Sequence, residues 1–411
     1  MPKTWLTHPT SNTNVRAVAM ALEEFRLLDR FHSCITIGQD IRNPLLRKLY
    51  KQRQCAIPEK RIRRHPIRET LRLLAQKIAF FQPLLKHETG PLCIDQIYRH
   101  LDLDVARALC KDACSADAIY AYEDGALEVF RAASKLGVRR LYDLPIGYWR
   151  FARRLQTEEA ELKPEWAMTM AALKDSEAKL ARKDEELRLA EAIYVASSFT
   201  AKTLEEVPFE IPKPVVIPYG CPSSIISPDK LPAPAEKLRV LYVGSLGQRK
   251  GLSYLLDAID ALGDSVELTI VGRRVADCAP LDAALEHHNW IESLPHSRIL
   301  ETMRQHDVFV FPSLFEGFGL VLTEALSQGL PIIATAHTCA PDIIEDGKEG
   351  FIVPIRDAES IATKLQFMNG NPEGLREMKE AAIQASQRIT WQRYRNGLAS
   401  AVKGFLETTR S

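Results

Sequence analysis

The sequence predicts two α/β domains, each with a doubly wound sheet, joined by a proline-rich linker. In both halves, short apolar runs rich in β-branched residues alternate with longer amphipathic stretches, the pattern of helices packed on a sheet. A length of 411 residues accommodates two or three domains of about 100–200 residues each. Between Ile217 and Lys237, prolines cluster with serines and the periodicity stops, so we expect a linker there.

Composition excludes several classes of protein. The chain is 46% hydrophobic and 26% charged, as globular proteins are, so neither a disordered nor a collagen-like chain is expected. No uncharged apolar run approaches the roughly 18 residues of a membrane span, and the N-terminus lacks a secretion signal. The eight cysteines are scattered without a CxxC pair or a His/Cys cluster, which argues against a zinc site or a disulfide framework. We therefore expect a cytoplasmic protein without a metal.

In the first half, five short apolar runs are expected to be strands and one amphipathic stretch a helix. Asn14–Arg30 carries apolar residues on one face, with Asn14 as its N-cap. Residues 158–191 alternate in charge, and we interpret them as two solvated helices with ion pairs four residues apart. The expected strands are Ser33–Gly38, Ala118–Glu123, Arg140–Leu144, Ile193–Ser197 and Pro214–Pro218.

The second half repeats the alternation more clearly. Helical segments separate its apolar runs, and a last amphipathic helix, from about Trp391, closes the chain. The expected strands are Leu238–Val243, Val266–Val271, Val308–Phe311, Pro331–Thr335 and Gly350–Val353.

A basic glycine-containing loop follows the first of these strands. Val243–Gly251 reads VGSLGQRKG and leads directly into a helical pattern. Backbone N–H groups at such a strand-to-helix turn favour an anion, and Arg249 and Lys250 add fixed positive charge. The spacing excludes both the P-loop and the classical dinucleotide fingerprint. By itself, the loop is equally compatible with an ordinary turn.

A second informative stretch, Phe311–Pro331, follows the strand HDVFVF. It predicts a loop with Gly317 and Gly319 and then a helix over Leu320–Ser327. Glu316 then lies in the loop and Glu324 lies inside the helix, from where two carboxylates can reach sugar hydroxyls from different directions. Acidic pairs are usually ordinary surface, but two glutamates that bracket GFGLVLT after an apolar strand are rarer.

Together these motifs resemble the E-x7-E signature of retaining GT-B glycosyltransferases, and most closely glycosyltransferase family 4, the glycosyl transferases group 1. Further matches are LTIVGRR, APDIIEDGKEGFIVP and ITWQRY, so the resemblance covers about residues 225–411. The N-terminal half resembles the family in layout and in AIYVASSFT and VIPYG. The resemblance implies a GT-B architecture, with two Rossmann-like domains facing across a cleft. We then expect an acceptor-binding domain at 1–225, a nucleotide-sugar (donor)-binding domain at 226–390, and a helix at 391–411 that packs back toward the N-terminal domain.

The resemblance also implies roles for residues of the C-terminal half. By position, Glu316 contacts the donor sugar, Glu324 binds the ribose hydroxyls, and Lys250 neutralises the leaving diphosphate. The family's arginine is replaced by Ser245, so Arg249 is expected to supply that charge. The implied catalytic set is Glu316, Lys250 and Arg249. The implied donor-binding set is Gly244, Ser245, Arg273, Gly317, Phe318, Gly319, Leu320 and Glu324.

The N-terminal half departs from the family pattern. The loop His8–Asn14 stands where family members have a glycine-rich loop, and Tyr122 stands where they have a histidine. A second family histidine aligns with Tyr142 or Asp143, whereas Glu123 keeps an acidic position. The resulting cleft candidates are Asn12, Thr13, Asn14, Tyr122, Glu123 and Asp143.

The implied function is retaining transfer of a sugar from a UDP- or GDP-linked donor to a hydroxyl of a saccharide or lipid-linked acceptor, without a cofactor or metal. Fixed cations would stabilise the leaving diphosphate, and its departing oxygen would take the acceptor's proton. One alternative is an inactive protein that only binds a nucleotide sugar, because the family histidine is absent. Another is a phosphorylase or epimerase of similar fold, although no lysine suggests a pyridoxal phosphate site.

A basic stretch lies near the N-terminus. Arg42–Lys77 contains 12 Lys and Arg against Glu59 and Glu69. A solvated helical face is one interpretation, and contact with anionic lipid headgroups beside a lipid-linked acceptor is another. Nucleic-acid binding is a distant third, because no recognised module accompanies the charge. The protein would then be peripheral at the inner face of the membrane.

Overall fold

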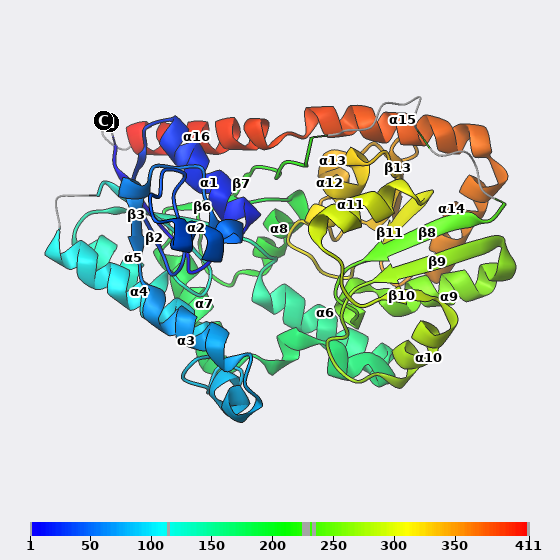
Figure 1. The fold of residues 1–411 in the computed structure, drawn as a ribbon, viewed down its shortest axis with the longest axis horizontal. Coiled ribbons are helices and arrows are strands. Elements are labelled where there is room, and N and C mark those ends of the chain that lie inside the picture. The colour runs from blue at the N-terminus through cyan, green and yellow to red at the C-terminus, as the bar shows by residue number, and fades with distance from the viewer. Residues whose placement is uncertain (1, 113–115, 224–230, 232–235, 409–411) are drawn as a thin grey trace.

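The computed structural model describes residues 2–112, 116–223, 231 and 236–408. Each half of the molecule contains one parallel sheet (Figure 1). The N-terminal sheet has the strand order β3-β2-β1-β4-β5-β6-β7. Successive strands are added on one side of β1 up to β3 and on its other side from β4 onward, as in a doubly wound sheet. Its strands are β1 (Thr4–Thr7), β2 (Leu28–Ser33), β3 (Ile62–Arg64), β4 (Ala118–Tyr122), β5 (Arg139–Leu144), β6 (Ala192–Val195) and β7 (Val215–Val216).

Helices cover both faces of the N-terminal sheet. Buried apolar side chains of α1 and α16 belong to one core cluster, and most of those of α4 and α5, with Leu187 of α7, belong to a second cluster. The helices of this half are α1 (Thr13–Glu24), α2 (Pro44–Leu49), α3 (Pro66–Ala75), α4 (Ile94–Lys111), α5 (Leu127–Lys135), α6 (Trp149–Leu162), α7 (Glu177–Leu189) and α8 (Ser198–Thr203).

The first helix and the strand after it differ from the sequence expectation. Asn12, rather than Asn14, is the N-cap of α1, since its side chain accepts a hydrogen bond from the Val15 N–H. The helix ends well before Arg30 because Arg26 adopts a left-handed φ of 58°. The chain then enters β2 at once, so the strand expected at Ser33–Gly38 was wrong. β1 and β3 were not anticipated.

The charged stretch 158–191 is not the pair of solvated helices that we expected. Glu159 of α6 and Glu186 of α7 are both fully buried. Glu186 accepts hydrogen bonds from the backbone N–H groups of Asp124, Ala126 and Leu127. These two carboxylates therefore satisfy buried donors, whereas the side chain of Glu177 is 78% exposed. The expected ion pairs four residues apart do occur, as between Arg182 and Glu186.

The C-terminal sheet follows the same plan, with the order β10-β9-β8-β11-β12-β13. The five expected strands are confirmed, with Pro331 outside its strand, and the three-residue β10 was missed. The strands are β8 (Leu238–Val243), β9 (Val266–Val271), β10 (Asn289–Ile291), β11 (Val308–Phe311), β12 (Ile332–Thr335) and β13 (Gly350–Val353). The helices are α9 (Leu252–Leu262), α10 (Ala279–His287), α11 (His296–Arg304), α12 (Leu320–Ser327), α13 (Ala340–Ile343), α14 (Ala358–Gly370) and α15 (Pro372–Arg388).

The last helix, α16 (Trp391–Thr408), runs back from the C-terminal half to the N-terminal half, along the top of the molecule in Figure 1. It packs against α1, and Arg395 forms an ion pair with Glu24 there at 3.0 Å. The terminal helix thus lies against the N-terminal half. A β-bridge between Cys221 and Thr390 places the two crossings between the halves side by side. Most of the expected linker, and the 225/226 boundary, lie outside the described residues.

Candidate functional site

A cavity of about 430 Å³ lies at the carboxyl ends of β8 and β11. These are the two neighbouring parallel strands between which the strand order of the C-terminal sheet reverses. Ligands of doubly wound sheets bind at such a switch point. Asn14, Pro145 and Tyr219 line the cavity from the N-terminal half. The C-terminal half contributes Val243, Gly244, Ser245, Arg249, Lys250, Phe311, Glu316, Phe318, Gly319, Leu320, Val321 and Glu324.

The three predicted catalytic side chains meet in this cavity. One Glu316 carboxylate oxygen contacts Lys250 Nζ, and it lies 3.4 Å from Arg249 Nη1. Arg249 Nη1 also donates to the Phe315 carbonyl at 2.7 Å, which fixes the guanidinium. The loop after β8 carries both cations and the loop after β11 carries the carboxylate, so the fold of the C-terminal half alone assembles the group.

Both cations are held in a poorly solvated place. Burial lowers the pKa of Arg249, and burial together with the neighbouring Arg249 lowers the pKa of Lys250 well below its ordinary value. Contact with the Glu316 carboxylate works in the opposite direction, because it favours the charged ammonium. Lys250 Nζ also lies 4.6 Å from the centre of the Phe311 ring. A bound anion would relieve the mutual repulsion of the two cations.

The N-terminus of α12 opens into the same cavity. Gly319 is its N-cap with a φ of 85°, a conformation that favours glycine, and no side chain of the described residues caps the first turn. The first N–H groups of an uncapped helix are available to an anion. Phe318, Gly319 and Leu320, all predicted to bind the donor, line the cavity here.

Glu324 lies further along α12 with its side chain 20% exposed. Its carboxylate is 2.9 Å from His296 Nε2, which comes from α11, and this contact raises the pKa of His296. Sequence reasoning missed His296, and nothing in its local pattern distinguishes it. The histidine holds Glu324 in place from the outer side of the helix.

Two predicted donor-binding residues lie outside the cavity. Gly317 packs against the N-terminal half, and its carbonyl accepts hydrogen bonds from Ser197 Oγ at 2.5 Å and Thr200 Oγ1 at 2.8 Å. A Cβ on Gly317 would lie 1.9 Å from the Pro145 carbonyl oxygen, so its glycine serves a close contact between the halves. Arg273 follows β9 with an exposed side chain and does not line the cavity.

Of the six predicted N-terminal candidates, Asn14 alone lines the cavity. Its side-chain amide donates to the Tyr219 hydroxyl at 3.2 Å. Asn12 caps α1, the Thr13 hydroxyl accepts a hydrogen bond from Arg16, and Glu123 forms an ion pair with Lys183 at 3.0 Å. These contacts are structural in kind.

Tyr122 and Asp143 belong to a buried polar group behind the cavity. Asp143 accepts a hydrogen bond from the Tyr120 hydroxyl at 2.6 Å, and burial raises its pKa to about 7. The Tyr122 hydroxyl is buried with no hydrogen-bond partner among the described residues. Its ring lies 4.7 Å from the ring of His8, whose pKa burial lowers to about 4. Sequence reasoning placed His8 in the loop but did not place it against Tyr122.

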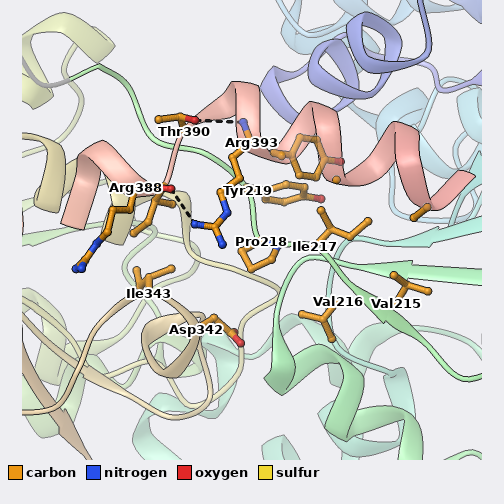
Figure 2. Close-up of a pocket in the computed structure, with 14 residues that line it drawn as sticks. Val215, Val216, Ile217, Pro218, Tyr219, Asp342, Ile343, Arg388, Thr390 and Arg393 are labelled. Atoms are coloured by element: carbon orange, nitrogen blue, oxygen red, sulfur yellow. Dashed lines mark hydrogen bonds between the residues drawn. The ribbon is translucent and has the colours of Figure 1, made fainter. Parts of the chain in front are cut away.

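A second pocket of about 420 Å³ lies where the chain crosses between the halves (Figure 2). Arg393 extends from α16 toward the Arg388 carbonyl, to which its Nη1 donates at 3.5 Å, whereas the Arg388 side chain points away (Figure 2). Tyr219 lines both pockets and stacks on Trp391 with ring centres 6.0 Å apart. Tyr219 thus connects the segment that crosses between the halves with the cavity at β8 and β11.

Comparison with known proteins assigns most of the C-terminal half to a family of glycosyl transferases. The family model described as glycosyl transferases group 1 matches residues 224–385. A phosphatidyl-myo-inositol mannosyltransferase of Mycobacterium leprae is 33% identical over 160 residues, which cover 37% of this chain and 42% of that protein. The putative colanic acid biosynthesis glycosyltransferase WcaL of Escherichia coli is 28% identical over 163 residues, which cover 36% and 39%. This chain therefore aligns with less than half of the length of either relative.

Comparison with solved structures concerns the fold of the whole chain. Sucrose-phosphate synthase from Thermosynechococcus elongatus superposes with a TM-score of 0.66 at 18% identity, over 99% of this chain and 100% of that one. Anabaena HepE in complex with UDP-glucose superposes with a TM-score of 0.63 at 14% identity, over 98% and 100%. Among the described residues, no helix is both long and apolar enough to span a membrane. The C-terminal half is therefore a glycosyl transferases group 1 domain, in a chain whose two parallel sheets have the GT-B fold.

Proposed function

We propose that this protein is a retaining hexosyltransferase of family 4 that moves a sugar from a UDP- or GDP-linked donor to a hydroxyl acceptor. The observation that carries this proposal is the meeting of Lys250, Arg249 and Glu316 beside the open N-terminus of α12. Two cations and free N–H groups suit a diphosphate, and a carboxylate suits sugar hydroxyls. The acceptor is a saccharide or a lipid-linked saccharide.

The proposed step breaks the anomeric C–O bond of the donor and forms a C–O bond to the acceptor on the same face of the sugar. Negative charge then grows on the leaving diphosphate, where Lys250 and Arg249 stabilise it. The departing phosphate oxygen takes the acceptor's proton, which balances the reaction. In this proposal the two cations do what a metal does elsewhere, so neither a metal nor a cofactor takes part.

Donor binding also requires an exchange of partners within the site. Before the donor arrives, Glu316 is the counter-ion of Lys250. A diphosphate at Lys250 takes over that place and frees the carboxylate for the sugar. Glu324, held by His296, is proposed to bind the ribose hydroxyls.

A panel of nucleoside diphosphate sugars tests this function through the nucleoside diphosphate that is released. Release that grows when saccharide acceptors are added, with the anomeric configuration kept in the product, is the expected result. Donor binding with no turnover on any acceptor would instead favour the inactive nucleotide-sugar-binding alternative. Inversion at the anomeric carbon would contradict the retaining mechanism.

We also propose that the enzyme works in the cytoplasm, peripherally at the inner face of the membrane, through the basic stretch Arg42–Lys77. Part of this positive charge is already neutralised in the fold. Arg61 pairs with Glu23, Arg64 with Glu59, and Arg72 with Glu69. The other Lys and Arg side chains of this stretch are the ones that would meet anionic headgroups.

A further inference from the structure

An apolar stripe runs along the exposed side of α3 and continues beyond its end. Ile67, Leu71, Leu74 and Ile78 follow one another at helical spacing and are 75%, 48%, 54% and 46% exposed. Phe80, in the short 3-10 helix Ala79–Leu85 that follows, is 84% exposed. We call these five side chains the α3 face. Helix α3 lies at the lower edge of the N-terminal half in Figure 1.

This stripe is unusual for the molecule. Of the 15 large hydrophobic side chains that are exposed among the described residues, seven lie between Leu45 and Phe81. Single exposed apolar residues need no explanation, but a contiguous group marks a surface that something else covers. In the described chain, no other element covers the α3 face.

Positive charge predominates in the segment of the chain that carries the stripe. Residues 59–86 contain eight Lys and Arg and two Glu, a formal charge of +6. Among the described residues, five of these cations have no acidic partner, in contrast to Arg61, Arg64 and Arg72. The five are Lys60, Arg63, Arg68, Lys77 and Lys86.

A groove of about 600 Å³ adjoins the stripe between α3 and α4. Ile67 and Leu71 of the α3 face form one wall, and Leu92, Ile97 and Leu101 are further apolar residues of its lining. Arg68 and His100 also line it. The lining thus combines apolar and basic groups with one carboxylate, that of Asp104, which lies 3.4 Å from His65.

We propose that the α3 face docks on a lipid bilayer with anionic headgroups. The five apolar side chains enter the boundary between headgroups and acyl chains, and the five unpaired cations meet lipid phosphates, as amphipathic helices in the plane of a membrane do. This inference deepens the proposed function, because it places the acceptor-binding half at the surface that holds a lipid-linked acceptor. The core of a protein–protein interface is depleted of charge, which favours the bilayer over a second copy of the chain.

Insertion of apolar side chains into a bilayer responds to salt differently from binding to its surface through charge alone. Salt shortens the screening length to a few ångströms at about 0.5 M, so a purely electrostatic contact is lost there. Buried apolar surface does not respond to salt in this way. The α3 face therefore predicts that part of the vesicle binding survives high salt.

Flotation with vesicles made of equal amounts of phosphatidylcholine and phosphatidylglycerol tests the proposal. The variant Leu71→Ser/Leu74→Ser/Phe80→Ser is expected to lower the partition coefficient at least about tenfold and to abolish the salt-resistant part. The matched control is Leu136→Ser/Leu162→Ser/Phe367→Ser, which removes exposed apolar side chains elsewhere and should bind as the wild type does. Arg68→Gln/Lys77→Gln should weaken binding to these vesicles but leave the salt-resistant part.

Several outcomes would overturn the inference. They are a wild-type protein that does not float with these vesicles, a triple variant that floats equally well, and a wild-type dimer in sedimentation that the triple variant abolishes. The last result would assign the face to a second copy of the chain. Circular dichroism confirms that each variant folds, and donor hydrolysis in free solution should be equal in all of them. Donor hydrolysis lost in every protein, the wild type included, would count against the proposed function and leave the flotation result unaffected.

Discussion

The C-terminal half places Arg249, Lys250 and Glu316 at the wall of a cavity, whereas the N-terminal half buries comparable charged side chains among its own elements. Lys250 and Glu316 are each other's counter-ions at the cavity wall, and a ligand can separate them. Asp102 and Glu186 are fully buried and bound to backbone N–H groups, which no ligand can replace. The difference indicates that the C-terminal half supplies the electrostatics of the proposed reaction, and the N-terminal half supplies a rigid wall.

The strongest test of this comparison is Lys250→Ala. Because Lys250 would face charge that grows as the bond breaks, we expect its loss to lower kcat by about 10²–10³. Arg249→Ala should weaken the same effect, and the double variant should be non-additive if both side chains touch one phosphate. Steady-state kinetics on folded protein measures this. Lys348→Ala, which removes an exposed partner of Glu345, is the control and should keep the wild-type rate.

A folded Lys250→Ala protein with wild-type kcat would remove the leaving-group assignment. It would also remove the proposed difference between the two halves, because the charged side chains at the cavity would then stabilise the fold and not the reaction, as the buried ones of the N-terminal half do.

Asp102→Ala tests the opposite side of the comparison. Asp102 accepts hydrogen bonds from the N–H groups of Glu128 and Val129, both at 2.8 Å, and from Arg182 at 2.6 Å. Its removal leaves the two backbone N–H groups unpaired and Arg182 with Glu186 as its remaining acidic partner, so we expect the free energy of unfolding to fall by about 3 kcal/mol. Urea denaturation measures the loss, while kcat of the folded fraction should stay unchanged. Asp104→Ala, on the same helix but half exposed, should change stability by less than about 0.5 kcal/mol.

The pH dependence of stability gives a third test. Burial raises the pKa of Asp143 to about 7, above the ordinary value of 3.8 that it regains on unfolding. Between these values the folded protein keeps a proton that the unfolded chain has lost, so this carboxyl's contribution to stability falls as the pH rises through that window. The expected loss is a few kcal/mol at about pH 8 relative to about pH 4. Asp143→Asn should remove this part of the slope in urea denaturation, and an unchanged slope would contradict the assignment.

The two halves also differ in how far the sequence could predict them. The five strands expected after Lys237 are contiguous apolar runs, such as LRVLYV and VELTIV, whose identity does not depend on their neighbours. β1 is four residues long, and β2 reads LDRFHS, in which four of the six residues are polar. Such segments become strands because the sheet around them buries them, and local pattern does not carry that information.

The site follows the same rule. Arg249, Lys250 and Glu316 could be predicted because two short loops at the ends of adjacent strands bring them together. The burial of Glu159 could not, because it depends on α6 docking against the other half. There Glu159 accepts hydrogen bonds from Gln248, Tyr254 and Arg356. The position of Gly317 outside the cavity could not be predicted either, because it follows from the close approach of Pro145 in the N-terminal half.

The smallest expected effect concerns Tyr122, which stands where the family resemblance places a histidine. Tyr122 and Tyr120 lie two residues apart on β4, and both are buried. The Tyr120 hydroxyl donates to Asp143, whereas the Tyr122 hydroxyl has no partner among the described residues. Tyr120→Phe should therefore lower the free energy of unfolding by about 1–2 kcal/mol, and Tyr122→Phe should leave it unchanged or raise it slightly.

Turnover separates a structural Tyr122 from one that reaches the cleft. Since the structure keeps its hydroxyl out of the cavity, we expect Tyr122→Phe to have wild-type kcat and KM in steady-state assays. A folded Tyr122→Phe protein with clearly lower kcat and unchanged nucleotide affinity would show that the hydroxyl reaches the sugar or the acceptor when the donor binds. The N-terminal half would then contribute a chemical group that emerges only on ligand binding, and its buried polar groups could no longer be regarded as a rigid wall.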